Sequence, residues 1–223
     1  MGIEQLVARL ISLVLLLTAG YNPSIIDELT STELALKDVA IGVFSGDFDR
    51  SAFEFRDNAW FAGSVLVFYP PENKNTSYSI PEGTTAIMPM AFHYNDCIQQ
   101  ITCPASLVYI GSEAFCQTHL SGIDLNHVKM IGGSAFEGAG LSVVNLPDQI
   151  VYIGPFAFYG VRIKKNTHVV LPPTLLYIGS DIVVSGNSSY DTFEPIYEVV
   201  SGSYAYDWVL ENGYDYVVID QRD

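Results

Sequence analysis

Basic residues are scarce in this sequence: ten Lys and Arg stand against 25 Asp and Glu, which gives a formal net charge of −15. A surface this acidic repels phosphate backbones. The one basic cluster, Arg162 with Lys164 and Lys165, is too small to reverse that repulsion. We therefore expect no nucleic acid among the partners. Most of the excess acid lies at the two ends of the chain, and the middle is nearly neutral.

Cysteine is also scarce, and the patterns of common reactive sites are missing. Cys97, Cys103 and Cys116 are odd in number, and none stands in a Cys-x-x-Cys or similar metal-binding spacing. Buried thiols are the expected state, although a disulfide between one pair remains open. Gly132-Gly133-Ser134 lacks the closing glycine of a serine-hydrolase elbow. The sequence predicts no catalytic residue, no metal site and no cofactor, hence no enzyme.

Long hydrophobic runs are absent as well. The N-terminal run Leu10–Leu17 is far shorter than the ~20 apolar residues of a membrane-spanning helix, so no stable transmembrane anchor is expected. Two interpretations of residues 1–20 remain open. Arg9 before the run and small residues after it fit a signal peptide cleaved near Gly20. The alternative is an N-terminal cap helix, because Leu6, Leu10, Leu13 and Leu17 would share one face.

The middle of the chain contains an internal repeat. Ala-Phe pairs recur 21 to 23 residues apart, at Ala91-Phe92, Ala114-Phe115, Ala135-Phe136 and Ala157-Phe158. An Ile-Gly pair precedes the last three of these, at Ile110, Ile131 and Ile153, and Ile178 begins a fifth copy without Ala-Phe. We expect these phenylalanines and isoleucines to form the core, with each glycine placed where a Cβ would crowd the turn.

Between the Ala-Phe pairs lies a second pattern, Leu-x-x-Leu-x-Leu, as in Leu120-x-x-Ile123-x-Leu125. Its last two apolar residues are two apart and would point to one face of a short strand. The intervening residues would point outward and form a sheet surface that is a candidate for binding. The outward candidates are Gln100, Thr102, Asp124, Asn145 and His168.

Strings such as Cys103–Phe115 (CPASLVYIGSEAF) and Leu146–Phe158 (LPDQIVYIGPFAF) resemble the BspA-like, or Treponema-type, leucine-rich repeats. The resemblance covers roughly residues 60–220. It implies a leucine-rich-repeat solenoid of the α/β class, rich in β structure, with one short parallel strand per repeat of about 22 residues and a capping element at each end.

The flanks are less regular. Val39–Phe44 could be a decayed repeat, and Phe53–Phe68 alternates like a hairpin that turns near Ala62-Gly63. Tyr204–Asn212, with Gly213 directly after it, predicts a short helix with a glycine C-cap. We accordingly divide the chain into residues 1–20 (signal peptide or cap helix), 21–79 (N-terminal flank), 80–200 (repeat array) and 201–223 (C-terminal cap).

The family resemblance implies an extracellular or cell-surface module that binds or adheres to a protein, a host or matrix protein included. The alternative is a spacer or capping fragment of a larger surface protein with no ligand of its own. Because one fold supports many functions, this ranking rests on analogy.

Overall fold

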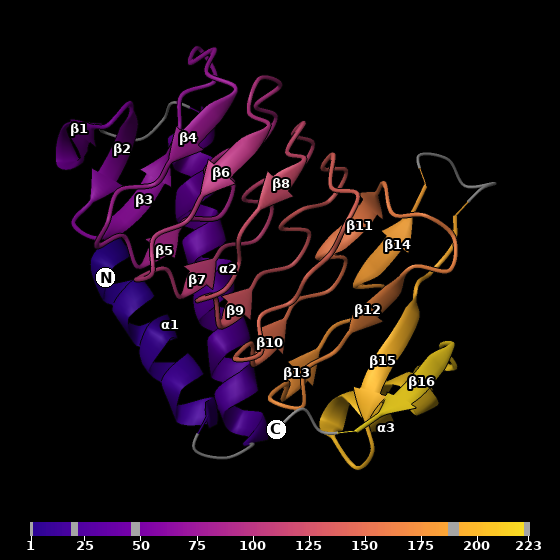
Figure 1. Cartoon of the computed structure of the whole chain (residues 1–223). Helices are drawn as coiled ribbons and strands as arrows, with labels where there is room; N and C mark the ends of the chain where they lie inside the picture. Colours follow the sequence, from indigo (N-terminus) through magenta and orange to yellow (C-terminus); the bar gives the residue numbers. More distant parts are fainter. Residues whose placement is uncertain (1, 19–21, 46–49, 187–191, 221–223) are drawn as a thin grey trace.

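The computed structural model describes residues 2–18, 22–45, 50–186 and 192–220 (Figure 1). Its middle is a solenoid in which successive coils lie side by side, with a helical pair at the N-terminal end and a small helix at the C-terminal end. The helices are α1 (Ile3–Thr18), α2 (Pro23–Ser45) and α3 (Tyr204–Asn212), with a 3-10 turn at Arg50–Ala52. The predicted leucine-rich-repeat solenoid is therefore confirmed.

The largest sheet runs along one side of the solenoid. It contains three antiparallel strands and then one two-residue strand from each coil. The order is β1 (Glu54–Arg56), β2 (Ala59–Ala62), β3 (Val65–Phe68), β5 (Ala86–Ile87), β7 (Tyr109–Ile110), β9 (Met130–Ile131), β10 (Tyr152–Ile153) and β13 (Tyr177–Ile178). β1, β2 and β3 pair antiparallel, and every later pairing is parallel. The hairpin expected within Phe53–Phe68 is confirmed, with its β2–β3 turn at Gly63-Ser64.

The predicted Leu-x-x-Leu-x-Leu strands lie on the opposite side of the solenoid. There β4 (Ser77–Ser79), β6 (Gln100–Thr102) and β8 (Gly122–Ile123) pair in parallel. Farther along, β12 (His168–Val170), β15 (Ile196–Val200) and β16 (Tyr216–Ile219) form a second parallel sheet, and β11 (Phe158–Val161) pairs with β14 (Val183–Ser185). Most coils thus carry an additional strand, at Tyr-Ile or its equivalent, in the segment expected only to return the chain.

The repeated phenylalanines form one continuous stack through the core. Phe92, Phe115, Phe136 and Phe158 are at most 1% exposed, and successive ring centroids lie 4.8, 5.3 and 5.0 Å apart with nearly parallel planes. The isoleucines Ile110, Ile131, Ile153 and Ile178 are buried beside them. Each coil therefore buries its apolar side chains mainly against its neighbours, as the repeat predicted.

The glycine after each isoleucine permits the coils to approach closely. A Cβ on Gly132 would collide with the backbone of Ser112, and one on Gly154 with the backbone of Gly133 in the preceding coil. A Cβ on Gly111 would likewise collide with the backbone of Pro89, and one on Gly179 with the backbone of Pro155. The spacing between coils is thus set by the absence of a side chain at this position.

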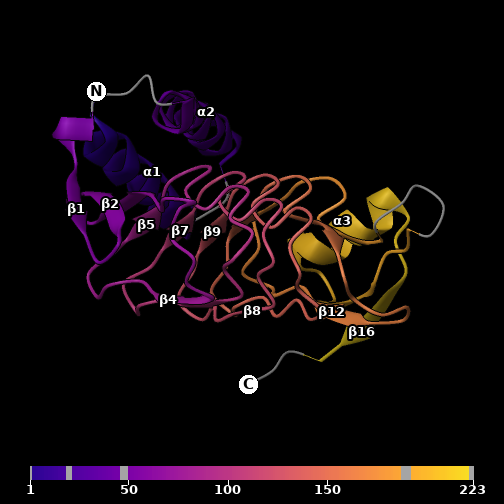
Figure 2. The same cartoon turned by 90° about the horizontal axis from the view of Figure 1, so that it is seen from above.

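Helices α1 and α2 pack against each other and lie along the side of the solenoid that carries β5, β7 and β9 (Figure 2). On α1, Leu6, Leu10, Leu13 and Leu17 are all buried, which is the arrangement of a cap helix. Cleavage near Gly20 remains a prediction, and residues 19–21 lie outside the described residues. None of the described helices is long and apolar enough to span a membrane.

Helix α2 also includes Val39–Phe44, so the interpretation of this segment as a decayed repeat is wrong. The physical reason is helical periodicity: Leu29, Leu36, Ala40 and Val43 are buried along one side of α2. The Ile41-Gly42 pair within this segment is part of α2 and does not mark a strand, unlike the Ile-Gly pairs of the repeats.

A buried carboxyl group joins α2 to the sheet. The Glu33 side chain accepts hydrogen bonds from Ser112 Oγ at 2.7 Å and from Tyr109 Oη at 3.2 Å, and Gly132 leaves the space that its carboxylate occupies. One turn farther along α2, Lys37 Nζ lies 2.5 Å from Glu113 Oε1. Burial raises the pKa of Glu33 above its ordinary value of 4.5, against the opposing effects of these hydrogen bonds and of the Lys37 charge.

The C-terminal cap has the predicted form. Ser203 caps the N-terminus of α3 by accepting a hydrogen bond from the Tyr206 amide, and Gly213 ends the helix in the left-handed conformation with φ of 72°. Trp208 and Val209 are buried against the end of the solenoid. The domain boundaries proposed at residues 79/80 and 200/201 stay predictions.

Truncation of the phenylalanine stack tests its contribution to stability. We expect Phe136→Ala to lower the free energy of unfolding by about 3–5 kcal/mol, because it opens a cavity between two stacked neighbours. The measurement is urea unfolding followed by circular dichroism. The exposed Phe55 provides the control, and Phe55→Ala should cost less than about 1 kcal/mol. Equal losses in the two variants would contradict a stacked core.

The pKa of Glu33 predicts a pH dependence of stability. Because the pKa is raised in the folded state, the protein binds more protons folded than unfolded. The contribution of Glu33 to stability is therefore fully present below its unfolded pKa, near 4.5. This contribution is lost as pH rises through the raised pKa of the folded state. We expect Glu33→Gln to flatten this fall in chemical-denaturation curves between pH 4.5 and 8. Glu72→Gln at an exposed site should keep the wild-type slope.

Candidate functional site

The first candidate surface is the strand face, the outward side of β4, β6 and β8. The register places Ser79 and Tyr78 of β4 beside Thr102 and Ile101 of β6. Ile101 in turn lies beside Ile123 of β8. Tyr78 and Ile101 are buried, whereas Gln100, Thr102 and Asp124 are exposed. The alternation expected from the repeat pattern is present here, and it leaves a polar row across neighbouring coils.

The remaining predicted residues of this face lie elsewhere. Asn145 is exposed, but its coil forms no strand at this position within the described residues. His168 is exposed on β12, in the second sheet, where its Nδ1 lies 2.8 Å from Glu198 Oε1. The five predicted residues are therefore brought together only in part, with three on the first sheet or at its edge. Their role in binding stays a prediction.

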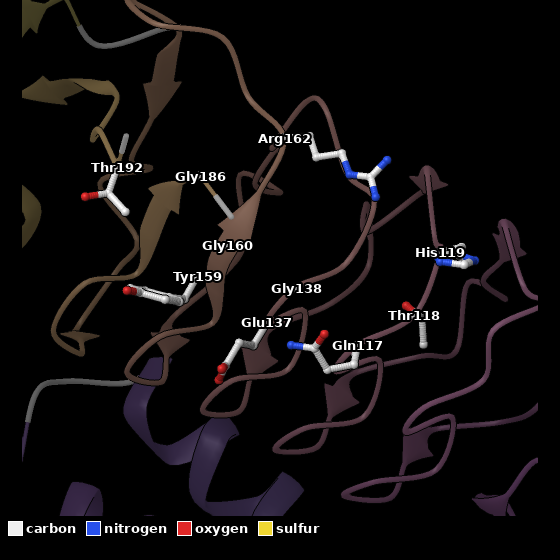
Figure 3. Close-up of a pocket in the computed structure, with 10 residues that line it drawn as sticks. All are labelled: Gln117, Thr118, His119, Glu137, Gly138, Tyr159, Gly160, Arg162, Gly186 and Thr192. Carbon is white, nitrogen blue, oxygen red and sulfur yellow. The ribbon is translucent and has the colours of Figure 1, made fainter. Parts of the chain in front are cut away.

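The second candidate surface is a groove at the Ala-Phe side of the solenoid, with a volume of about 430 Å³ (Figure 3). It crosses four coils between Gln117 and Thr192. Its side chains are mostly polar, including Gln117, His119, Glu137 and Arg162, together with the aromatic ring of Tyr159.

Glycines form the middle of this groove. Gly138 and Gly160 each stand two residues after a core phenylalanine and have φ of 66° and 72°, a region that glycine enters without strain. The amide of Gly138 donates to the Tyr159 carbonyl at 2.7 Å, and that of Gln117 donates to the Glu137 carbonyl at 2.7 Å. These bonds align the turns of neighbouring coils. The glycines add no side chain of their own to the groove, and the Gln117 side chain lies over Gly138.

The sequence analysis missed this groove. The available signal was the residue two positions after each core phenylalanine. It is glycine after Phe136 and Phe158, whereas the earlier coils have Tyr94 and Gln117 at this position. No single motif identifies the site, because its lining comes from four coils.

Other reactive groups form no centre. The described residues include all three cysteines, each of them free, and burial raises the pKa of the Cys103 and Cys116 thiols to about 12. Such thiols are poor nucleophiles at neutral pH. Within the same part of the chain, no group of three His, Cys, Asp or Glu side chains is assembled as a metal site would need.

Comparison with known proteins identifies the repeat. The model of the BspA type leucine-rich repeat region matches residues 67–188 in six copies, more than half of the chain. The chain belongs to this family. A comparison with curated proteins finds no match.

Several solved leucine-rich-repeat structures share the fold of this BspA-type protein. The pneumococcal vaccine antigen PcpA aligns with a TM-score of 0.57 and 20% identity over 77% of this chain and 48% of its own. A leucine-rich repeat protein from Eubacterium ventriosum gives 0.52 and 22% over 67% and 41%. A leucine-rich cell surface protein from Faecalibacterium prausnitzii gives 0.50 and 18% over 74% and 42%. The chain spans less than half of each of these structures.

Proposed function

We propose that this BspA-type solenoid is a secreted or cell-surface recognition module that binds a protein ligand along its strand face and has no catalytic activity of its own. The observation that carries the proposal is the row of exposed side chains at Gln100, Thr102 and Asp124. These residues alternate with buried ones along the strands, and their exposure makes them accessible to a ligand. The Asp124 carboxylate also accepts hydrogen bonds from Asn126.

The position of the face supports this proposal. Helices α1 and α2 lie on the opposite side of the solenoid, so none of the described helices covers β4, β6 and β8 (Figure 2). Repeat proteins commonly bind along a surface built from equivalent positions of successive coils. A cell-surface location is supported by likeness to a protein described as a leucine-rich cell surface protein, and export by the apolar segment in residues 1–20.

Charge reversal on the strand face tests the protein-binding role. The full chain is immobilised and screened against purified extracellular-matrix and serum proteins at physiological salt. We expect to find a ligand whose affinity falls at least about tenfold in the double variant Thr102→Arg/Asp124→Arg. The new arginines would repel a cationic group that pairs with Asp124, and their bulk would obstruct the interface.

The matched control places the same new side chains on α2, as Ser31→Arg/Asp38→Arg, where both residues are exposed on the other side of the molecule. This variant should bind as the wild type does. Equal loss in both double variants would contradict the strand face as the binding surface. A complete absence of ligands would favour a spacer or capping fragment instead.

Export predicts a processed N-terminus. If residues 1–20 act as a signal peptide, mass spectrometry of the protein secreted by its native host should find a chain that begins near Tyr21. An intact Met1 in the cytoplasmic fraction would contradict export by this segment and favour the cap-helix interpretation of α1.

A further inference from the structure

The groove of Figure 3 has a chemistry that the strand face lacks. Tyr159 is 37% exposed, and the edge-to-face contact of its ring with Phe156, at 5.8 Å between centroids, restrains it. Beside it lie Gly138, Gly160 and Gly186, which present no side chains. A restrained aromatic ring next to a glycine backbone, as at Gly160, accepts a flat, partly apolar molecule at close range.

The polar lining suits hydroxyl groups. A hydroxyl both donates and accepts, and it is best matched by side chains that offer both functions or a mixture of them. Gln117 offers a donor and an acceptor, Glu137 two acceptors, and Arg162 only donors. The amide of Gln117 lies over Gly138, since a Cβ there would collide with it. These groups therefore surround the glycines from two sides, as Figure 3 shows.

One edge of the groove is cationic, against the charge of the rest of the protein. Arg162 lines the groove, and Lys164 and Lys165 are exposed close by in the chain, beyond the buried Ile163. Within the described part of the chain none of the three forms an ion pair. In a chain with net charge −15, these are cations available for a ligand.

We propose that this groove binds a saccharide that carries an anionic group, with the sugar rings over Tyr159 and the glycines and the anion at Arg162. The guanidinium group can bind a carboxylate or a sulfate through two parallel hydrogen bonds. Lys164 and Lys165 add favourable potential at the same edge. The proposal is independent of the strand face, because the two surfaces share no residue.

A peptide ligand fits the groove less well. Peptides are recognised through apolar pockets, aromatic-lined grooves or the backbone of an open strand edge. The lining here is mostly polar, and the backbone groups of Gln117 and Gly138 are already hydrogen-bonded to the next coil. An acidic peptide is therefore the competing outcome of the test.

Three related sugars separate the contributions of the ring and the anion: lactose, 3′-sialyllactose with a carboxylate, and lactose 3′-sulfate. The full chain, labelled with nitrogen-15, is titrated with each at low salt and followed by amide chemical shifts. We expect the Gly138 and Gly160 amides to shift, with at least one anionic sugar binding about tenfold or more tightly than lactose. The preferred sugar identifies the anion, and added salt should weaken its binding.

Two variants with matched controls assign the roles. Arg162→Gln should reduce the affinity for the anionic sugars to that for lactose. The control Lys74→Gln removes an exposed cation outside the groove and should leave the affinity unchanged. Tyr159→Ala should weaken all three sugars at least about tenfold. Tyr94→Ala removes an exposed ring from the same face outside the groove and should have no effect. Thermal unfolding of each variant establishes that it is folded.

Several outcomes would overturn the proposal. One is the absence of shifts at the groove amides with every sugar up to about 10 mM, a concentration that would nearly saturate a site with a Kd of about 1 mM. Another is equal affinity for lactose and both anionic sugars, or affinity that Arg162→Gln does not change. Binding of hexaglutamate that depends on Arg162, without sugar binding, would replace the saccharide with an acidic peptide.

Discussion

The close approach of successive coils is the constraint on which the rest of the molecule depends. A coil of about 22 residues cannot enclose its own apolar side chains, so its stability comes from contact with the next coil. Two residue types make that contact possible: the phenylalanines that stack at about 5 Å, and the glycines whose missing Cβ admits the neighbouring backbone. Every strand pairing within the array follows from this spacing.

The same stacking determines which surfaces need a cover. In each two-residue strand of the large sheet, the isoleucine faces the core and its neighbour faces away from it. These outward neighbours, Tyr109, Met130 and Tyr152, are large and nevertheless buried, and hydrogen bonds join α2 to this row. The strand face carries small or polar residues at its outward positions and needs no helix. The side chains next to the motif residues thus determine which side of the solenoid a helix covers and which side stays exposed.

The array could be predicted because its signals are local and repeated. Four Ala-Phe pairs at nearly constant spacing define the coils, and Gly213 after nine helix-compatible residues defines α3. The strands at Tyr-Ile could not be recognised, since two residues are too few to show a period of two. The prediction for Val39–Phe44 was wrong for a related reason, because an Ile-Gly pair alone does not distinguish a repeat coil from a helix. The longer pattern of α2 decides between them.

The groove could not be predicted because stacking does not specify its residues. The position two residues after the core phenylalanine has a positive φ in four coils, at Tyr94, Gln117, Gly138 and Gly160. Stacking fixes the backbone at this position, but the side chain points away from the core and is free to vary. Where the residue changes from tyrosine or glutamine to glycine, the surface becomes hollow. Such positions, where the repeat fixes the conformation and leaves the side chain unconstrained, are therefore where we propose that ligand selectivity resides.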